Sequence, residues 1–156
     1  MDPDDLYGLA PEEFVAARDA LAKELRAAGE RERAKEVKAL AKPSRAAGVV
    51  NRLVREHPEE ADAVREAARC LEEAQDEVLA GGDPGALREA AEAARAAVER
   101  LTARVEGQSA AVREAVRSTL HAATVDADAR EEVLGGRLLK ERAAAGFGGL
   151  DLALAA

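Results

Sequence analysis

Residues 86–105, ALREAAEAARAAVERLTARV, decide the fold class expected for this chain of 156 residues. Apolar residues recur in this stretch at alternating spacings of four and three, which is the heptad pattern of an amphipathic helix with one apolar seam. The seam positions are Leu87, Ala91, Ala94, Val98, Leu101 and Val105. A glycine-rich turn, 81–85, precedes the stretch, and Asp83 in that turn is a typical N-cap residue. Segment 59–80 has a similar periodicity, so we expect 59–106 to fold as a long antiparallel helical hairpin.

The composition extends the helical prediction to the whole chain. Only 2% of the residues are aromatic although 47% are hydrophobic, so the core must be built from Leu, Val and Ala, as in closely packed helices. Further helices are expected at 10–28, 30–41, 43–57, 109–123 and about 126–138. The predicted fold is an all-α, single-domain bundle of six or seven helices with the long hairpin at its centre.

We expect residues 1–156 to form one helical domain with four parts. These parts are a basic three-helix N-terminal part (10–57), the long hairpin (59–106), the C-terminal helices (109–145) and an irregular tail (146–156). In the tail, Leu150 and Leu152 are expected either to dock on the bundle or to fray.

The sequence predicts a cytoplasmic protein. No uncharged apolar stretch reaches the roughly 18 residues that a membrane-spanning helix needs, so no membrane partner is expected. Residues 1–14, MDPDDLYGLAPEEF, are acidic and lack the basic and apolar regions of a secretory signal. Cys70 is the only cysteine, so no intrachain disulfide can form.

Charge is distributed unevenly along the chain. The net charge is −8, which argues against nucleic acid as the main partner. Residues 14–55 nevertheless carry 11 Lys or Arg and 5 Asp or Glu, so this region is locally basic.

The basic region contains the outline of a helix-turn-helix, the motif in which a second helix reads base edges in the major groove. Segment 37–44 would be the supporting helix and turn, and 45–55 would be the recognition helix. Arginine can bond guanine and asparagine can bond adenine. The candidate nucleic-acid contacts are Lys38, Lys42, Arg45, Asn51, Arg52 and Arg55, with Arg31 and Lys35 in support.

The same stretch is more typical of a corner between two packed helices. Lys38 and Lys42 fall near the place where a helix-turn-helix needs a small residue, and a buried lysine there would be costly. Pro43 stands where such motifs have a glycine turn. Long basic side chains also commonly cover a solvated helix face, so both interpretations stay open.

Two blocks of this sequence resemble a family of uncharacterised actinobacterial helical proteins. The first block lies within 14–55 and includes Leu21-Ala22, Lys42-Pro43-Ser44 and Asn51-Arg52-Leu53; the second includes Thr119–Ala123, Gly136-Arg137-Leu138 and Gly146-Phe147-Gly148. The resemblance covers nearly the whole chain, although it is weak in the Ala/Glu/Arg-rich middle. Members often have a tryptophan where Gly48 stands here. The family has no established activity, so the resemblance implies kinship and no mechanism.

No residue pattern indicates catalysis, a metal or a cofactor. His57 precedes Pro58 at a helix end, where the helix dipole favours a cation, so a capping role is expected. His121 has no His, Cys or Asp one turn away. Cys70 adjoins the inward Leu71 and is expected to act as a small hydrophobic side chain, with a reactive thiol beside Arg69 as the alternative. No phosphate loop or nucleotide fingerprint is present. We therefore do not expect an enzyme.

The sequence leaves two candidate functions. The first is a helical interaction protein that binds another protein, or itself, through an Ala/Leu/Val face. The alternative is a nucleic-acid-binding protein that uses the basic region 31–55. The net acidity and the heptad seam favour the first.

Overall fold

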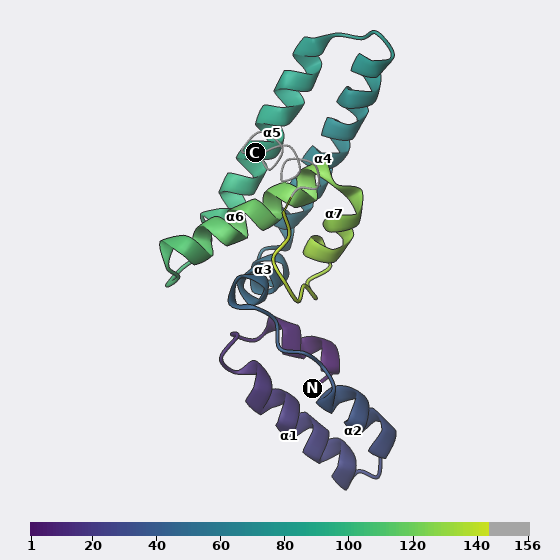
Figure 1. Ribbon diagram of the computed structural model, residues 1–156, viewed down its shortest axis with the longest axis vertical. Coiled ribbons are helices and arrows are strands. Elements are labelled where there is room, and N and C mark those ends of the chain that lie inside the picture. The colour runs from purple at the N-terminus through teal and green to yellow at the C-terminus, as the bar shows by residue number, and fades with distance from the viewer. Residues whose placement is uncertain (144–156) are drawn as a thin grey trace, which may run out of the picture.

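The computed structural model describes residues 1–143, and these form seven α-helices and one 3₁₀-helix (Figure 1). The elements are η1 (Pro3–Gly8), α1 (Phe14–Ala27), α2 (Arg31–Lys38), α3 (Arg45–Glu56), α4 (Pro58–Leu79), α5 (Pro84–Thr102), α6 (Ala110–Val125) and α7 (Ala127–Leu134). The described residues contain no strand, so the all-α prediction is confirmed. The tail 146–156, with Leu150 and Leu152, lies outside the described residues.

Helices α4 and α5 form the predicted hairpin, which extends beyond the rest of the molecule in Figure 1. The Asp83 side chain accepts a hydrogen bond from the Gly85 N–H at 2.9 Å, so the predicted N-cap is present. Seam residues such as Val98 and Leu101 are almost fully buried, because the seam packs within the chain. Val105 lies beyond the last residue of α5 but is buried as well.

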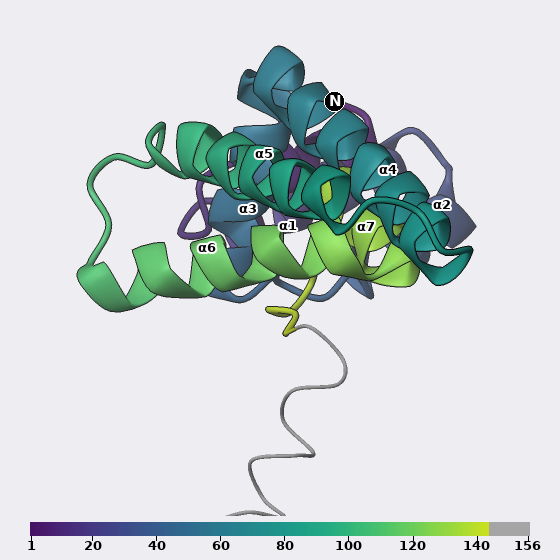
Figure 2. The ribbon, with the colours of Figure 1, turned by 90° about the horizontal axis from the view of Figure 1, so that it is seen from above.

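The main core lies between two layers of helices. Figure 2 shows the hairpin as one layer and α6 with α7 as the other, and α6 contacts both α4 and α5. Ser109 caps α6 and Asp126 caps α7, since each side chain accepts a backbone N–H of its helix. The core consists of Ala, Val and Leu, as the composition predicts.

Helix α3 is the most buried helix of the bundle. Ser44 caps it by accepting a hydrogen bond from the Ala47 N–H at 3.2 Å. The helix packs against η1, α4, α6 and α7, and every residue from Ala46 to Asn51 is buried. The small side chains Ala46, Ala47 and Gly48 permit this close approach on several sides.

A second, smaller core joins η1, α1 and α2. It contains Phe14, Leu21 and Val37, and the Tyr7 and Phe14 rings lie 5.6 Å apart. This lobe contacts α3 through η1. Helix α3 itself belongs to the main core, whereas α1 and α2 belong to the smaller one.

The C-terminal segment, defined here as residues 135–143, is not helical. The sequence predicts a helix to about residue 138, but α7 ends at Leu134, and Gly136 has a φ of 73° that favours glycine. The segment lies along α3, where the Ser44 N–H donates to the Leu139 carbonyl at 2.9 Å. None of the described helices is both long and apolar enough to cross a membrane.

Candidate functional site

The two helices of the helix-turn-helix alternative, α2 and α3, pack against different neighbours. Helix α2 packs against α1, whereas α3 packs against η1, α4, α6 and α7. Lys38 pairs with Asp19 of α1 at 2.8 Å. Helices α2 and α3 therefore belong to different parts of the molecule, and most of α3 is buried against its neighbours.

Asn51 is the clearest correction among the predicted contacts. Its side chain is fully buried and bonds the backbone of Leu138 through both its amide nitrogen and its oxygen. It therefore does not reach the surface, where an adenine would have to bind. Gly48, on the same helix, packs closely against Pro11.

Three of the predicted basic contacts lie on α3, and each is paired with an acidic neighbour. Arg45 pairs with Glu12 at 2.6 Å, Arg52 with Glu56 at 2.9 Å, and Arg55 with Asp4 at 3.1 Å. Arg55 also donates to the Gly136 carbonyl at 3.1 Å and is half-buried. Lys42 is exposed and forms no ion pair with any residue in 1–143, although its charge helps to lower the Glu12 pKa after the Glu12 backbone N–H and Arg45. The charges of Arg45, Arg52 and Arg55 are therefore balanced by carboxylates.

A second arrangement on α3, which includes Arg52, forms a cavity that we call the slot. It is a partly open cavity of about 380 Å³ between α3 and the connection from α5 to α6. Its lining residues are Val49, Arg52, Leu53, Glu56, His57, Ala103, Arg104, Val105, Glu106 and Gln108.

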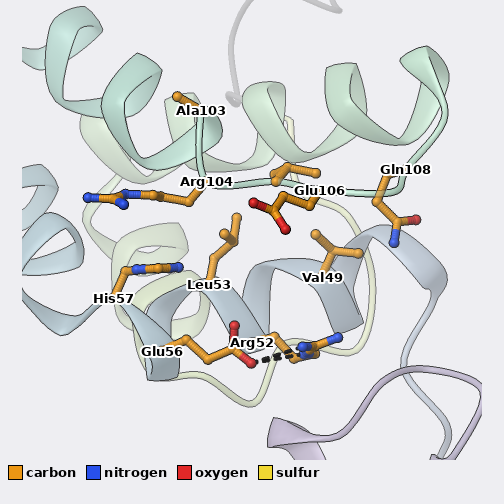
Figure 3. A pocket seen from close by; sticks show the side chains of 10 residues that line it. Val49, Arg52, Leu53, Glu56, His57, Ala103, Arg104, Glu106 and Gln108 are labelled. Atoms are coloured by element: carbon orange, nitrogen blue, oxygen red, sulfur yellow. Dashed lines mark hydrogen bonds and ion pairs between the residues drawn. The ribbon is translucent and has the colours of Figure 1, made fainter.

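The slot has an apolar floor and charged walls. Val49, Leu53 and Val105 form the floor and belong to the main core. Figure 3 shows the Glu106 carboxylate pointing into the slot, on the side opposite the Arg52–Glu56 pair. His57 and Arg104 lie at one end and Gln108 lies at the other (Figure 3).

Three hydrogen bonds hold the α5–α6 connection in place over α3. Arg104 donates to Glu60 of α4 at 2.6 Å, at one end of the slot. Arg45 donates to the Gln108 side-chain oxygen at 3.1 Å, at the other end. Arg113 of α6 donates to the Val105 carbonyl at 3.0 Å. The slot is therefore part of the folded framework and not a gap between loose loops.

Electrostatics at the Arg104 end favour ionised carboxylates. A hydrogen bond from its own backbone N–H, followed by the Arg104 guanidinium, lowers the pKa of Glu60. His57 lies at the C-terminal end of α3, as expected, and its backbone N–H donates to the Leu53 carbonyl; its side chain makes no cap hydrogen bond to α4.

The other reactive residue types lie apart from the slot. His121 is exposed on α6, and Cys70 is exposed on α4, where its thiol donates to Glu66 at 3.9 Å. The expectation that Cys70 is a core residue is therefore wrong. Within residues 1–143, no three His, Cys, Asp or Glu side chains are grouped as a metal site would require.

Comparison with known proteins finds no family model, no curated protein and no solved structure that matches this chain. The resemblance to the actinobacterial helical family therefore stays a prediction.

The sequence did not indicate the slot. Its two walls, 49–57 and 103–108, are about 50 residues apart in the chain. Gly107-Gln108-Ser109 gave the one local signal, a helix break, and a break does not reveal which helix it will cover. Glu106 and Gln108 could be assigned to a site only after the fold was known.

Proposed function

We propose that this chain is a non-catalytic helical interaction protein that binds another protein through the slot. The observation that carries the proposal is the slot itself, an apolar floor with charged walls built on buried helices. Binding sites on proteins commonly combine an apolar surface with a few fixed polar groups. The hydrogen bonds from Arg45, Arg104 and Arg113 keep the walls in place, so a partner would not have to order them.

The heptad seam, which is the other candidate binding surface, is largely used inside the chain. Helix α5 packs against α4, and the seam residues Ala94, Val98, Leu101 and Val105 are buried within the chain, so this part of the seam is not free to bind a partner helix. The large apolar side chains that are exposed in the described residues lie on different elements. They are Met1, Val15, Leu79, Val125 and Leu139. Scattered apolar residues do not form the contiguous patch that self-association through an apolar face would need.

No specific observation in the described residues favours the nucleic-acid alternative. Its candidate arginines are neutralised by carboxylates, its asparagine is buried, and the chain is acidic overall. A phosphate backbone would have to displace those carboxylates before it could be bound.

The proposed setting is the cytoplasm, and this rests on the sequence alone. The chain has one cysteine and no apolar segment long enough to suggest a membrane anchor.

Site-specific photo-crosslinking in extract of the native cells tests the proposed function. A photoreactive residue at Gln108 would report on the slot, and the same residue at Gln75, on an exposed part of α4, is the matched control. We expect one protein to be crosslinked at position 108, with equal yield before and after nuclease treatment, and not at position 75.

The proposal is wrong if position 108 yields no crosslinked protein above the control, or if nuclease removes the product. A product made of two copies of this chain would replace the proposal by self-association, and sedimentation of the purified chain would then have to show a dimer.

A further inference from the structure

The slot contains one carboxylate that is not neutralised by any described residue. Arg52 donates to Glu56 at 2.9 and 3.2 Å, and Arg104 donates to Glu60 at 2.6 Å. Glu106 is exposed and makes no hydrogen bond or ion pair to another side chain in residues 1–143, yet it points into the slot (Figure 3).

The paired charges around the slot cancel, and one carboxylate is left over. Glu56 is paired with Arg52, and Arg104 is paired with Glu60 of α4, so Glu106 is the lining carboxylate without a basic partner among the described residues. One positive charge would complete the balance at the position that Glu106 faces.

We propose that the slot binds a lysine side chain of the protein partner, an inference that rests on the proposed function. The aliphatic stem of the lysine lies on Val49, Leu53 and Val105, and its ammonium group donates to Glu106. Lysine suits such a place because it combines a long apolar stem with a compact charge and three donors. The cavity of about 380 Å³ is near the lower limit for ligand pockets, so it fits one side chain better than a cofactor.

The charge of the whole molecule agrees with a basic partner. The net charge of −8 attracts a basic surface from a distance and increases its rate of encounter. The apolar floor and Glu106 then select one side chain from that surface.

An anionic ligand is the main competitor, because Arg52, Arg104 and His57 line the same slot. Both guanidinium groups are already bonded to carboxylates, however. An anion would have to break the Arg52–Glu56 or the Arg104–Glu60 pair, whereas an ammonium group needs neither pair to open.

Titration of the isotope-labelled full chain by NMR tests the inference with defined probes. The probes are Nα-acetyl-lysine amide, the same molecule acetylated on its ε-nitrogen, and Nα-acetyl-glutamate amide. We expect saturable shifts of the 49–57 and 103–108 backbone amides with the lysine probe, with a Kd in the millimolar range that suits so small a ligand. The acetylated and glutamate probes should bind at least about tenfold more weakly, because they cannot donate a charged hydrogen bond.

Two substitutions of equal charge change separate the slot from general acidity. Glu106→Gln removes the proposed acceptor, and Glu92→Gln removes an exposed carboxylate on α5. We expect Glu106→Gln to weaken the lysine probe about tenfold and Glu92→Gln to leave its Kd unchanged.

The inference is overturned by the absence of saturable shifts, by equal Kd values for Glu106→Gln and the unmodified chain, or by preference for the glutamate probe. The photo-crosslinking at position 108 tests the proposed function independently of the lysine assignment. If the position-108 product forms at full yield in Glu106→Gln, a protein partner exists but the lysine assignment is wrong.

Discussion

The side-chain amide of Asn51 and the backbone of Leu138 form a reciprocal pair of hydrogen bonds. Asn51 Nδ2 donates to the Leu138 carbonyl at 2.9 Å, and the Leu138 N–H donates to Asn51 Oδ1 at 2.7 Å. Both residues are buried, so water does not satisfy these groups. The pair joins α3 to the C-terminal segment, and it connects the two blocks of sequence that carry the family resemblance. The side-chain amide that was a candidate for binding adenine instead bonds the backbone N–H and carbonyl of Leu138.

Replacement of Asn51 tests this structural role. Asn51→Leu keeps a similar volume but leaves the Leu138 N–H and carbonyl buried without partners, so we expect a loss of about 2–4 kcal/mol in the free energy of unfolding. Urea denaturation at neutral pH measures it. Arg52→Gln is the control, since it removes an exposed pair one position away and should cost less than about 0.5 kcal/mol. Equal effects of the two substitutions would contradict the role.

Gly48 allows close packing, and this predicts the sign of a second substitution. A Cβ at this position would lie 2.7 Å from Pro11 Cγ. In an open helix, glycine to alanine stabilises by about 0.5–1 kcal/mol, but here we expect Gly48→Ala to destabilise by about 1–3 kcal/mol. Thermal or urea unfolding would measure the change.

Pro11→Ala provides the matching background for this experiment. It removes the Cγ atom that a Cβ at position 48 would approach, so Gly48→Ala should cost clearly less in the double variant than alone. Additive costs would show that Pro11 is not the obstacle. A tryptophan, which the resembling family often has at this place, would need the space that Pro11 occupies in this chain.

The hairpin and the helix starts could be predicted from the sequence because their signals are local. The heptad seam, the Asp83 cap and the Ser109 cap all depend on residues within a few positions of one another. The seam correctly indicated that Leu101 is buried, and the structure shows that its partner is α4.

The surroundings of α3 could not be predicted, because they depend on distant segments. The sequence offered Asn51 as a candidate nucleic-acid contact together with the arginines of the same helix. The structure instead places Leu138 against Asn51 and Pro11 against Gly48, and no local pattern brings these two distant residues to α3. The slot was missed for the same reason, since Glu106 meets α3 only when the bundle has formed.

Two leucines of the helical hairpin should differ in how much they contribute to the free energy of unfolding. Leu101 is fully buried in the main core, whereas Leu79, at the end of α4, is 86% exposed. We expect Leu101→Ala to lower the free energy of unfolding by about 3–5 kcal/mol, because it loses apolar burial and leaves a cavity. Leu79→Ala should change it by less than about 0.5 kcal/mol. Urea unfolding compares the pair, and a similar cost at both sites would refute the packing described for the hairpin.

The arrangement of the basic residues predicts a negative result with nucleic acid. In a gel-shift assay at low salt, we expect neither double- nor single-stranded probes to be retarded by the chain. The reason is that Arg45, Arg52 and Arg55 are paired with carboxylates and face different neighbours. Retardation that disappears with rising salt, and that Arg45→Gln with Arg52→Gln reduces, would restore the nucleic-acid alternative.

The contacts of Asp4 predict a specific dependence of stability on pH. Hydrogen bonds from Arg55, and then from Arg137, lower the pKa of Asp4 below its ordinary value of 3.8. A carboxyl group whose pKa is lowered by folding stabilises the folded state above its unfolded pKa, and this contribution is lost as the pH falls through the folded pKa. The Asp4 side chain is 35% exposed, so we expect Asp4→Asn to cost at most about 1 kcal/mol at pH 7.

The difference between Asp4→Asn and the unmodified chain should shrink between about pH 4 and pH 2, because Asp4 itself becomes neutral there. Urea unfolding at a series of pH values measures it. Asp62→Asn, at an exposed position of α4, is the control and should track the unmodified chain throughout. A difference for Asp4→Asn that stays constant down to pH 2 would show that the ion pairs linking η1 to α3 do not stabilise the fold through the charge of Asp4.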